Sequence, residues 1–507
     1  MSENFGDFLQ RAPADALAFI DVGANPPASE RQVDFGQLWA AARGAAAYLR
    51  SRGLKPGDAV ALLGVNSLEY FAAHVGTMLA GMVSVPVNYR FPAETIDFVL
   101  RDSATRLVLT DAEMAGNVAD DIPNEPLEGR FEEWRAMDDG APGVDVAGEA
   151  PCLVLYTSGS TGRPKGVPLT HASQNWVVGC RLGGGDVSAH RLLVAAPYYH
   201  MNALAVSHFA LSAGASIVLL PRFTAPAYIG AIGRHRCTWL TSVPTMLAMM
   251  LREKELLAAT DLSSVKFVRM GSAPVTQALM DALAALFPGA AMTNGYGTTE
   301  AGPVAFGPHP EGKKAPVLSL GYPHPQVDVR LVDADGKESD EGVLEMRCPA
   351  VTPGYLNLPA KTAEAISADG FYHTGDVMRR DGDGFYYFVG RRDDMFVCGG
   401  ENIYPGEVEL MLEKHPDIAQ ACVVPVPDDI KGMKPLAAIV ARPGAAIEEE
   451  AVKQFALAHA PAYMHPRRVF VMDELPLAST NKIDRKAVLA LIENNQAPLA
   501  AAAQTGD

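Results

Sequence analysis

The stretch Val154-Leu-Tyr-Thr-Ser-Gly-Ser-Thr-Gly-Arg-Pro-Lys-Gly-Val167 follows an apolar, strand-like run at residues 152–156. Every residue from Thr157 to Gly162 is Gly, Ser or Thr. Such a run neither sustains a helix nor fills a core, but it offers hydroxyl and backbone N–H groups to an anion. Lys165 adds a mobile positive charge. The stretch therefore predicts a loop that holds a polyphosphate, and a flexible Ser/Gly turn is the alternative. It differs from the common phosphate loop G-x-x-x-x-G-K-[ST], because Pro164 takes the place of the second glycine.

The composition is that of a chain with several domains in a reducing compartment. With 507 residues the chain is too long for one core, which predicts roughly two to four domains. The net charge of −17 argues against broad binding to nucleic acid or anionic membranes. The six cysteines are widely spaced without a C-x-x-C pair, so neither a zinc site nor a disulfide framework is expected. Because there is no export signal and no apolar run of the ~18 residues that cross a bilayer, we expect a cytoplasmic protein without a membrane span.

The hydrophobic pattern predicts an α/β fold. Apolar strands alternate with amphipathic helices over residues 37–110, and the alternation resumes with further strands between residues 192 and 270. Repeated βαβ units of this kind indicate parallel sheets covered by helices. Residues 112–150 are rich in Asp, Glu, Gly and Pro and are interpreted as a surface connection outside the core.

The pattern changes past residue 326 to short strands bounded by turns such as Asp335-Gly336, which predicts a small antiparallel β subdomain. After Gly390 a charged run leads into a compact α+β pattern. We therefore predict a large N-terminal domain of parallel α/β sheets plus the antiparallel subdomain over residues 1–390. A small α+β C-terminal domain follows at 394–492. The Ala-rich residues 493–507 are predicted to form a disordered tail.

Six motifs occur in one order along the chain and together are very specific. They are the Gly/Ser loop, Asn294-Gly-Tyr-Gly-Thr-Thr-Glu300, Tyr372-His-Thr-Gly-Asp376, Gly390-Arg-Arg-Asp-Asp-Met395, Gly399-Gly-Glu-Asn-Ile-Tyr-Pro405 and Asn481-Lys-Ile-Asp-Arg485. The set resembles the adenylate-forming enzymes (acyl-CoA synthetases, nonribosomal adenylation domains and luciferases), and within them the acyl- or aryl-CoA ligase branch. The resemblance implies that the large domain binds ATP and an acid. It further implies that the C-terminal domain is a mobile catalytic lid, which turns about a hinge at residues 391–393 with Asp393 at the hinge position.

The reaction that this resemblance implies explains why the motifs carry phosphate-binding groups. A carboxylate is a poor electrophile, because its negative charge repels nucleophiles. Its attack on the α-phosphate of ATP gives an acyl-AMP and pyrophosphate, and a thiol then displaces AMP. The first step joins two anions, so the enzyme must supply fixed positive charge and N–H donors. ATP, Mg²⁺ and coenzyme A are therefore the expected cofactors and co-substrates.

The resemblance also assigns residues to the nucleotide. Tyr296 offers a flat face to adenine, and Asp376 and Arg391 meet the ribose hydroxyls. Arg392 is an equal candidate for the arginine if the alignment shifts by one position. Lys482 reaches the carboxylate and the α-phosphate oxygens. The implied ATP-binding set is Thr157, Ser158, Gly159, Ser160, Thr161, Gly162, Lys165, Asn294, Gly295, Tyr296, Gly297, Thr298, Thr299, Asp376, Arg391 and Lys482.

The implied catalytic residues are Lys482, Thr299, Glu300 and His200. Thr299 is placed at the α-phosphate, and Glu300 is the carboxylate that holds the metal ion Mg²⁺. His200 resembles the gating histidine next to the substrate carboxylate, and a core histidine with satisfied hydrogen bonds is the alternative. The chain departs from the family at Asn481, where the residue before the lysine is usually glycine. This departure concerns the conformation of the loop.

The implied acyl pocket consists mostly of small or apolar residues. They are His200, Asn202, Val243, Met246, Gly271, Ser272, Ala273, Gly295, Gly302 and Pro303. This composition predicts that the end of the acid away from its carboxylate is uncharged. The implied coenzyme A contacts are Gly399, Gly400, Tyr463, His465 and Arg467. The two glycines resemble the wall of a tunnel for pantetheine in the rotated state, and a solubilising surface is the alternative for the basic residues.

The predicted function is an ATP-dependent carboxylic acid–CoA ligase that forms an acyl-AMP and then an acyl-CoA thioester, with release of AMP and pyrophosphate. The expected substrate is an aromatic or medium-chain monocarboxylic acid. Alternatives are an adenylating enzyme that loads a carrier protein and a short-chain acid–CoA ligase. A non-catalytic nucleotide-binding protein is a rival from another class. The intact residues Lys165, Glu300, Asp376 and Lys482 argue against it. The sequence leaves the oligomeric state open, with a homodimer as one option.

Overall fold

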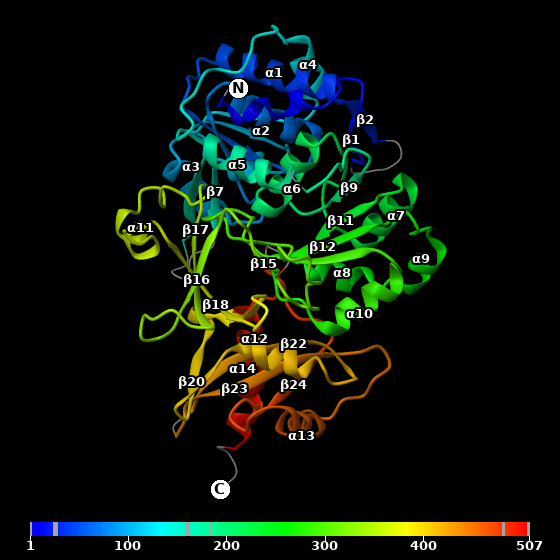
Figure 1. Ribbon diagram of the computed structural model, residues 1–507, viewed down its shortest axis with the longest axis vertical. Coiled ribbons are helices and arrows are strands. Elements are labelled where there is room, and N and C mark those ends of the chain that lie inside the picture. The colour runs from blue at the N-terminus through cyan, green and yellow to red at the C-terminus, as the bar shows by residue number, and fades with distance from the viewer. Residues whose placement is uncertain are drawn as a thin grey trace.

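The computed structural model describes residues 3–23, 29–157, 163–182, 184–428, 430–478 and 482–503, and the backbone alone for residues 495–503. Figure 1 shows two helix-covered sheets (blue to green) at one end, a small yellow-green sheet beside them, and the C-terminal strands (orange) at the other end. This arrangement confirms the predicted fold class. Within the described part, no helix combines the length and the hydropathy needed to span a bilayer.

A six-stranded sheet carries the segment that leads into the Gly/Ser loop. In order its strands are β6 (Asn124–Pro126), β5 (Thr105–Thr110), β3 (Ala59–Leu63), β4 (Val83–Pro86), β7 (Pro151–Thr157) and β8 (Lys165–Thr170). The central strands β3, β4 and β7 are short apolar runs rich in branched side chains, which favour extended chain. All neighbouring pairs are parallel except the last. Thr157 pairs with Lys165, so the lysine stands where β7 and β8 open into the loop. Residues 158–162 of the loop lie outside the described residues.

The first helices are η1 (Phe5–Arg11), α1 (Phe35–Ser51), α2 (Leu68–Leu79), α3 (Ala93–Asp102) and α4 (Arg130–Ala136). Helix α4 corrects the prediction that residues 112–150 form a surface connection outside the core. Phe131 and Trp134 are buried in the main core. Trp134 lies so close to α1 that a Cβ on Gly44 would meet its carbonyl oxygen. The polar composition of residues 112–150 concealed this short amphipathic helix.

A seven-stranded sheet forms the second large layer, and only its β1–β2 pair is antiparallel. In order its strands are β13 (Ala291–Gly295), β12 (Phe267–Gly271), β11 (Trp239–Ser242), β9 (Arg191–Val194), β10 (Ser216–Leu219), β1 (Leu17–Asp21) and β2 (Arg31–Asp34). The helices of this part are α5 (His171–Leu182), α6 (Met201–Ser212), α7 (Ala225–His235), α8 (Pro244–Met250), α9 (Lys254–Ala259) and α10 (Gln277–Leu286).

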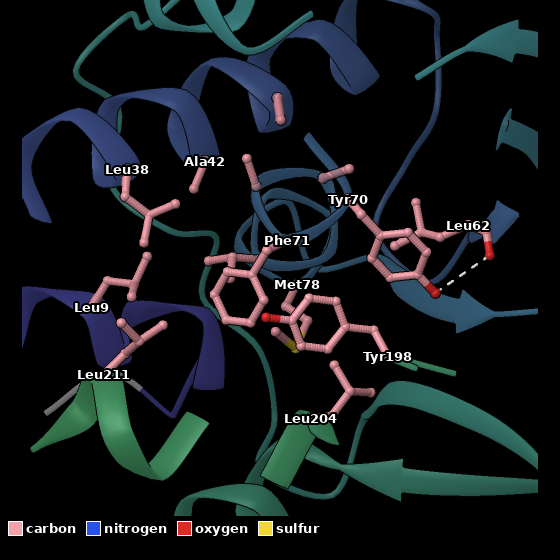
Figure 2. Close-up of a cluster of buried hydrophobic side chains, with 14 of the residues drawn as sticks. Leu9, Leu38, Ala42, Leu62, Tyr70, Phe71, Met78, Tyr198, Leu204 and Leu211 are labelled. Atoms are coloured by element: carbon pink, nitrogen blue, oxygen red, sulfur yellow. Dashed lines mark hydrogen bonds between the residues drawn. The ribbon is translucent and has the colours of Figure 1, made fainter. Parts of the chain in front are cut away.

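The main core lies between the two large sheets. Leu192 and Val194 of β9 point into it, whereas Leu193 belongs to a second cluster on the other face, because side chains alternate along a strand. Figure 2 shows the centre of this core, where Phe71 of α2 meets Tyr198 with ring centroids 5.4 Å apart. Burial on both faces explains why these strands are continuous apolar runs.

The small sheet is antiparallel throughout, as predicted. Its strands are β16 (Asp328–Val332), β17 (Glu341–Arg347), β18 (Tyr372–Arg380) and β19 (Tyr386–Arg391), with the short pair β14 (Phe306–Gly307) and β15 (Tyr322–Pro323) and helix α11 (Pro359–Ala365) nearby in sequence. The hydrophobic pattern did not predict β18, which carries polar residues of the His-Thr-Gly-Asp motif. Its register sets Asp376 directly opposite Arg391 of β19.

The C-terminal part is a five-stranded sheet with helices on both faces. Its elements are β20 (Phe396–Cys398), β21 (Glu401–Ile403), α12 (Pro405–Leu412), β22 (Ile418–Asp428), β23 (Gly432–Ala441), α13 (Glu449–His459), β24 (Val469–Met472) and α14 (Arg485–Ala503). Helices α12 and α13 share one hydrophobic cluster, and α14 packs on the opposite face through Val488 and Ile492. Helix α14 continues through residues 493–503 of the predicted disordered tail 493–507, and residues 504–507 lie outside the described residues.

Candidate active site

A cleft of about 1640 Å³ lies where the part that contains the two large sheets, the small antiparallel sheet and the C-terminal part meet. Strands β11, β12 and β13 end at this cleft, as parallel strands commonly do at ligand sites. The predicted site residues that line it are Thr157, Lys165, His200, Asn202, Val243, Met246, Gly271, Ser272, Ala273, Asn294, Gly295, Tyr296, Gly297, Thr298, Thr299, Glu300, Pro303, Asp376, Arg391, Asp393 and Lys482. Residues from distant motifs are therefore brought together in one place.

Asp376 is held between a tyrosine and an arginine. Tyr296 Oη donates a hydrogen bond to Asp376 Oδ2 at 2.5 Å, and Arg391 Nη1 donates to Asp376 Oδ1 at 2.8 Å. Burial raises the pKa of this carboxyl group, and the Arg391 guanidinium acts against that shift. Each carboxylate oxygen has two lone pairs, so a carboxylate fixed in this way can still accept hydrogen bonds from ligand hydroxyls.

Tyr355 joins two of the predicted phosphate- and metal-binding residues. Its Oη donates to Glu300 Oε1 at 2.9 Å, and Lys165 Nζ lies 4.1 Å from the centre of its ring. Burial, and then the charge of Glu300, raises the pKa of Tyr355, so the phenol stays a donor at neutral pH. No sequence motif contains Tyr355, because its role arises from a tertiary contact of the segment between β17 and α11.

Lys482 and His200 both line the cleft, Lys482 from the segment that precedes α14 and His200 from the N-cap of α6. Burial lowers the pKa of Lys482, and the nearby carboxylate of Asp376 acts in the opposite direction. Burial, and then the charge of Lys482, lowers the pKa of His200 to about 3, so its imidazole is neutral at pH 7. His200 Nε2 and Thr157 Oγ1 are buried without a hydrogen-bond partner among the described residues. Such atoms are rare in proteins and are well suited to meet a ligand.

The predicted acyl pocket contains a charge that its motif residues did not indicate. Arg269 of β12 lines the cleft, and its Nη1 donates to Asn202 Oδ1 at 3.1 Å. A Cβ on Gly295 would stand 2.6 Å from Arg269 Nη2, so glycine at this position leaves room for the guanidinium. Arg269 therefore adds a positive charge beside the small and apolar residues that were predicted to form this pocket. Gly302 does not line the cleft, and its carbonyl instead accepts from Thr298 N at 3.2 Å.

The residues predicted to contact coenzyme A lie away from the cleft, namely Gly399, Gly400, Tyr463, His465 and Arg467. The two glycines join β20 to β21 with φ of 63° and 93°, a backbone region that favours glycine. Arg467 Nη1 lies 2.9 Å from His465 Nδ1. Figure 1 places β20 toward the end of the molecule remote from β11 and β12. The orientation seen here therefore does not join these residues to the rest of the site.

The cleft offers Mg²⁺ a carboxylate rather than a complete protein cage. Among the described residues, no group of three or more His, Cys, Asp or Glu side chains could hold a metal ion. Glu300 is buried, and one of its two oxygens is engaged by Tyr355. This arrangement fits Mg²⁺, which commonly takes one or two carboxylates and completes its shell with substrate phosphates and water.

Comparisons with known proteins agree with this geometry. Residues 5–356 match the AMP-binding enzyme family, and residues 407–482 match the AMP-binding enzyme C-terminal domain. The chain is 35% identical to a feruloyl-CoA synthase of Amycolatopsis sp over 440 residues, which are 86% of this chain and 89% of the relative. It is 33% identical over 483 residues to the fatty acid–[acyl-carrier-protein] ligase ScoC of Streptomyces coeruleorubidus, covering 90% and 91% of the two chains. The solved anthranilate CoA ligase AuaEII in complex with anthranoyl-AMP is similar with a TM-score of 0.87 and 26% identity, covering 97% of each chain. The chain therefore belongs to the AMP-binding enzyme family and is an AMP-forming acyl-CoA synthetase.

Proposed function

We propose that the cleft holds ATP and a carboxylic acid side by side, and that the domain orientation seen here is the one that forms the acyl-AMP. The observation that carries this proposal is the position of Lys482. This lysine comes from the C-terminal part, yet it lines the same cleft as Glu300 and acts electrostatically on Asp376. We assign residues 1–390 to the domain that binds ATP and the acid, and residues 394–492 to the lid that delivers the lysine.

The nucleotide is gripped at both ends. Tyr296 and its neighbours in residues 294–299 hold the adenine, and Asp376 accepts hydrogen bonds from the ribose hydroxyls while Tyr296 and Arg391 fix its two oxygens. Lys165 and the Gly/Ser loop bind the β- and γ-phosphates. The unpartnered hydroxyl of Thr157 at the edge of that loop supports this placement.

The chemical step is an in-line displacement at the α-phosphate. A carboxylate oxygen of the acid attacks the phosphorus, the bond to the bridging oxygen breaks, and pyrophosphate leaves. Lys482 and Thr299 stabilise the negative charge on the α-phosphate oxygens. Neutral His200 carries no charge that would neutralise the attacking carboxylate, and it orients the acid by a hydrogen bond. When bound at Glu300, Mg²⁺ supplies further charge neutralisation at the phosphates.

The thioester step uses a second domain orientation. Asp393 lies in the short 3-10 helix Arg392–Asp394, between the last strand of the small sheet and the first strand of the C-terminal sheet. Rotation about this hinge, residues 391–393, removes Lys482 from the cleft and brings in Gly399 and Gly400 as the wall of a pantetheine tunnel. Tyr463, His465 and Arg467 then serve the rest of coenzyme A. Its thiol attacks the acyl carbon and AMP leaves.

The acyl body of the substrate is aromatic or of medium length. Apolar Val243 and Met246 line this side of the cleft beside small residues such as Gly271. The names of the feruloyl-CoA synthase and the anthranilate CoA ligase denote aromatic acids, which supports the same class here. A carrier protein is the second candidate for the acyl acceptor, and the similarity to an acyl-carrier-protein ligase favours testing it.

Pyrophosphate release in the presence of ATP, Mg²⁺ and single acids tests the proposed function. We expect release only with a suitable acid, with AMP rather than ADP as the second product. Free coenzyme A should then yield a thioester faster than an acyl-carrier protein does. Formation of ADP, or tight ATP binding without turnover on any acid, would rule out acyl adenylation.

The cellular setting belongs to the same proposal. All six cysteines are free thiols, which suits the reducing cytoplasm. A homodimer stays one option for the assembly, and sedimentation of the intact chain would decide it.

A further inference from the structure

Arg269 occupies a position from which its side chain must enter the substrate cleft. On β12 its neighbours Val268 and Met270 are fully buried in the second core. Because side chains alternate along a strand, Arg269 projects from the opposite face, toward Asn202 of α6. Its guanidinium also lies against Gly295 at the end of β13. It therefore stands among the residues that we assign to the acyl pocket.

This guanidinium has no acidic partner. Among the described residues, no carboxylate lies within ion-pair distance of Arg269, and its one hydrogen bond goes to the neutral amide of Asn202. A guanidinium presents five N–H donors, so most of the donors of Arg269 have no partner among the residues that the structure describes. Burial lowers the pKa of Arg269, which is the expected effect when a cation leaves water without gaining a counter-charge.

A second arginine adds to the unbalanced charge. Arg181 of α5 donates to the backbone carbonyls of Ala205 at 3.4 Å and Pro303 at 3.1 Å, both neutral acceptors. Burial, and then the neighbouring charge of Arg269, lowers the pKa of Arg181 to about 9. Both arginines therefore contact residues of α6, and Arg269 is the one that reaches the cleft surface.

Binding of a purely apolar acyl group beside Arg269 would be energetically unfavourable. It would displace water from Arg269 and leave a desolvated charge with unused donors, which is among the most unfavourable situations in a protein. An oxyanion would restore the balance, because carboxylates and sulfonates accept two parallel hydrogen bonds from the planar fork of an arginine. A neutral ester or hydroxyl would satisfy a donor without offsetting the charge.

We infer that the acid activated by this enzyme carries a second oxyanion, a carboxylate or a sulfonate, on its acyl part, and that Arg269 binds it between Asn202 and Gly295. Arg269 is thus a specificity-determining residue of the acyl pocket. The inference rests on the proposed function, and it replaces the expected monocarboxylic acid with an acid that bears a further negative group.

Matched acids test this inference through kcat/KM for pyrophosphate release. Each straight-chain acid of two to eight carbons is compared with analogues of equal length that end in a carboxylate, a sulfonate or a methyl ester, and benzoate is treated in the same way. We expect the wild-type enzyme to prefer one anionic analogue over both neutral ones by roughly 10- to 100-fold, the range of a charge-assisted bidentate contact. The preferred member of the carboxylate and sulfonate pair identifies the oxyanion.

Variants of Arg269 then show whether this residue is the cause. Arg269→Met should lower kcat/KM for the anionic acid by the same factor and leave the neutral acids within about threefold, whereas Arg269→Lys should retain part of the preference. Arg106→Met, at an exposed arginine of β5, is the matched control and should change neither. If Arg269→Met fails to bind ATP in calorimetry and is therefore misfolded, Arg269→Gln removes the same charge but keeps a side chain that can hydrogen-bond to Asn202, and it should cause the same selective loss.

The failures of the two proposals are distinguishable. If acids are adenylated but the anionic analogues are no better than the esters, the inference about Arg269 is wrong and the ligase function stands. An equal loss on all acids in Arg269→Met would likewise overturn the inference and leave the ligase function intact. If no acid of any kind releases pyrophosphate, the proposed function fails together with the inference.

Discussion

Replacing Tyr355 by phenylalanine tests how the cleft positions Glu300, the carboxylate that we propose binds Mg²⁺. The substitution removes Oη and its 2.9 Å hydrogen bond to Glu300 Oε1. It keeps the ring, whose centre lies 4.1 Å from Lys165 Nζ. The cation–π contact with Lys165 therefore remains, and only the hydrogen bond that fixes the position of the Glu300 carboxylate is lost.

The size of the effect follows from the burial of Glu300. A hydrogen bond to a charged group contributes about 1.5–3 kcal/mol. Because Glu300 is only 8% exposed, little water can replace the lost donor, and we expect the upper part of that range. A loss of ~2–3 kcal/mol corresponds to a fall of roughly 30- to 150-fold in kcat/KM for adenylation. Tyr355→Leu also removes the ring and should lose a further ~2- to 30-fold, since cation–π contacts contribute about 0.5–2 kcal/mol.

The assay follows pyrophosphate release over a range of Mg²⁺ concentrations, because a misplaced Glu300 should raise the Mg²⁺ requirement. Thioester formation from supplied acyl-AMP should stay within about twofold. Tyr387→Phe is the matched control, since it removes a comparable 2.8 Å bond, to Asp381 Oδ2 in the turn between β18 and β19. Full adenylation activity of Tyr355→Phe at limiting Mg²⁺, or equal losses in both half-reactions, would refute the positioning role.

Lys482→Ala should lower acyl-AMP formation by roughly 10²–10³-fold and spare thioester formation from supplied acyl-AMP, and equal losses would contradict its role at the α-phosphate. Asp393→Pro should do the reverse by freezing the hinge, with thioester formation at least about tenfold slower; a full-rate variant would exclude rotation at this residue. The buried pair His74–His208, with Nε2 atoms 3.0 Å apart, should make the fold acid-sensitive, because burial lowers both pKa values, that of His74 to about 3. Their contribution to stability is complete above the unfolded pKa of about 6.5 and is lost below it, by about 1.4 kcal/mol per histidine at pH 5.5. Urea unfolding at pH 7.5 and 5.5 should therefore differ more in the wild type than in His208→Asn, and equal differences would contradict this account.

The fold could be predicted wherever burial imposes a clear hydrophobic period. Strand β3 and helix α2 lie within the alternation of strands and helices predicted for residues 37–110, because both are apolar runs bounded by polar turns. Strand β18 was missed, since its motif residues serve the site and interrupt the apolar pattern. Trp134 was missed for the opposite reason, because one buried helix turn lies within a segment of charged and turn-forming residues.

The same division runs through the site. Tyr296, Asp376 and Lys482, which we propose contact the nucleotide, stand in motifs. Every adenylating enzyme must hold the same nucleotide, and a fixed ligand constrains local sequence in a recognisable way. Arg269 and Tyr355 reach the cleft only through tertiary contacts, with Asn202 and Glu300, that no local pattern records. The acid varies among relatives that share one nucleotide, so the residues that select it need not lie in the shared motifs. The identity of the substrate must therefore be sought in individual cleft side chains whose charge has no counter-charge. Arg269 is such a residue within the described part of this cleft.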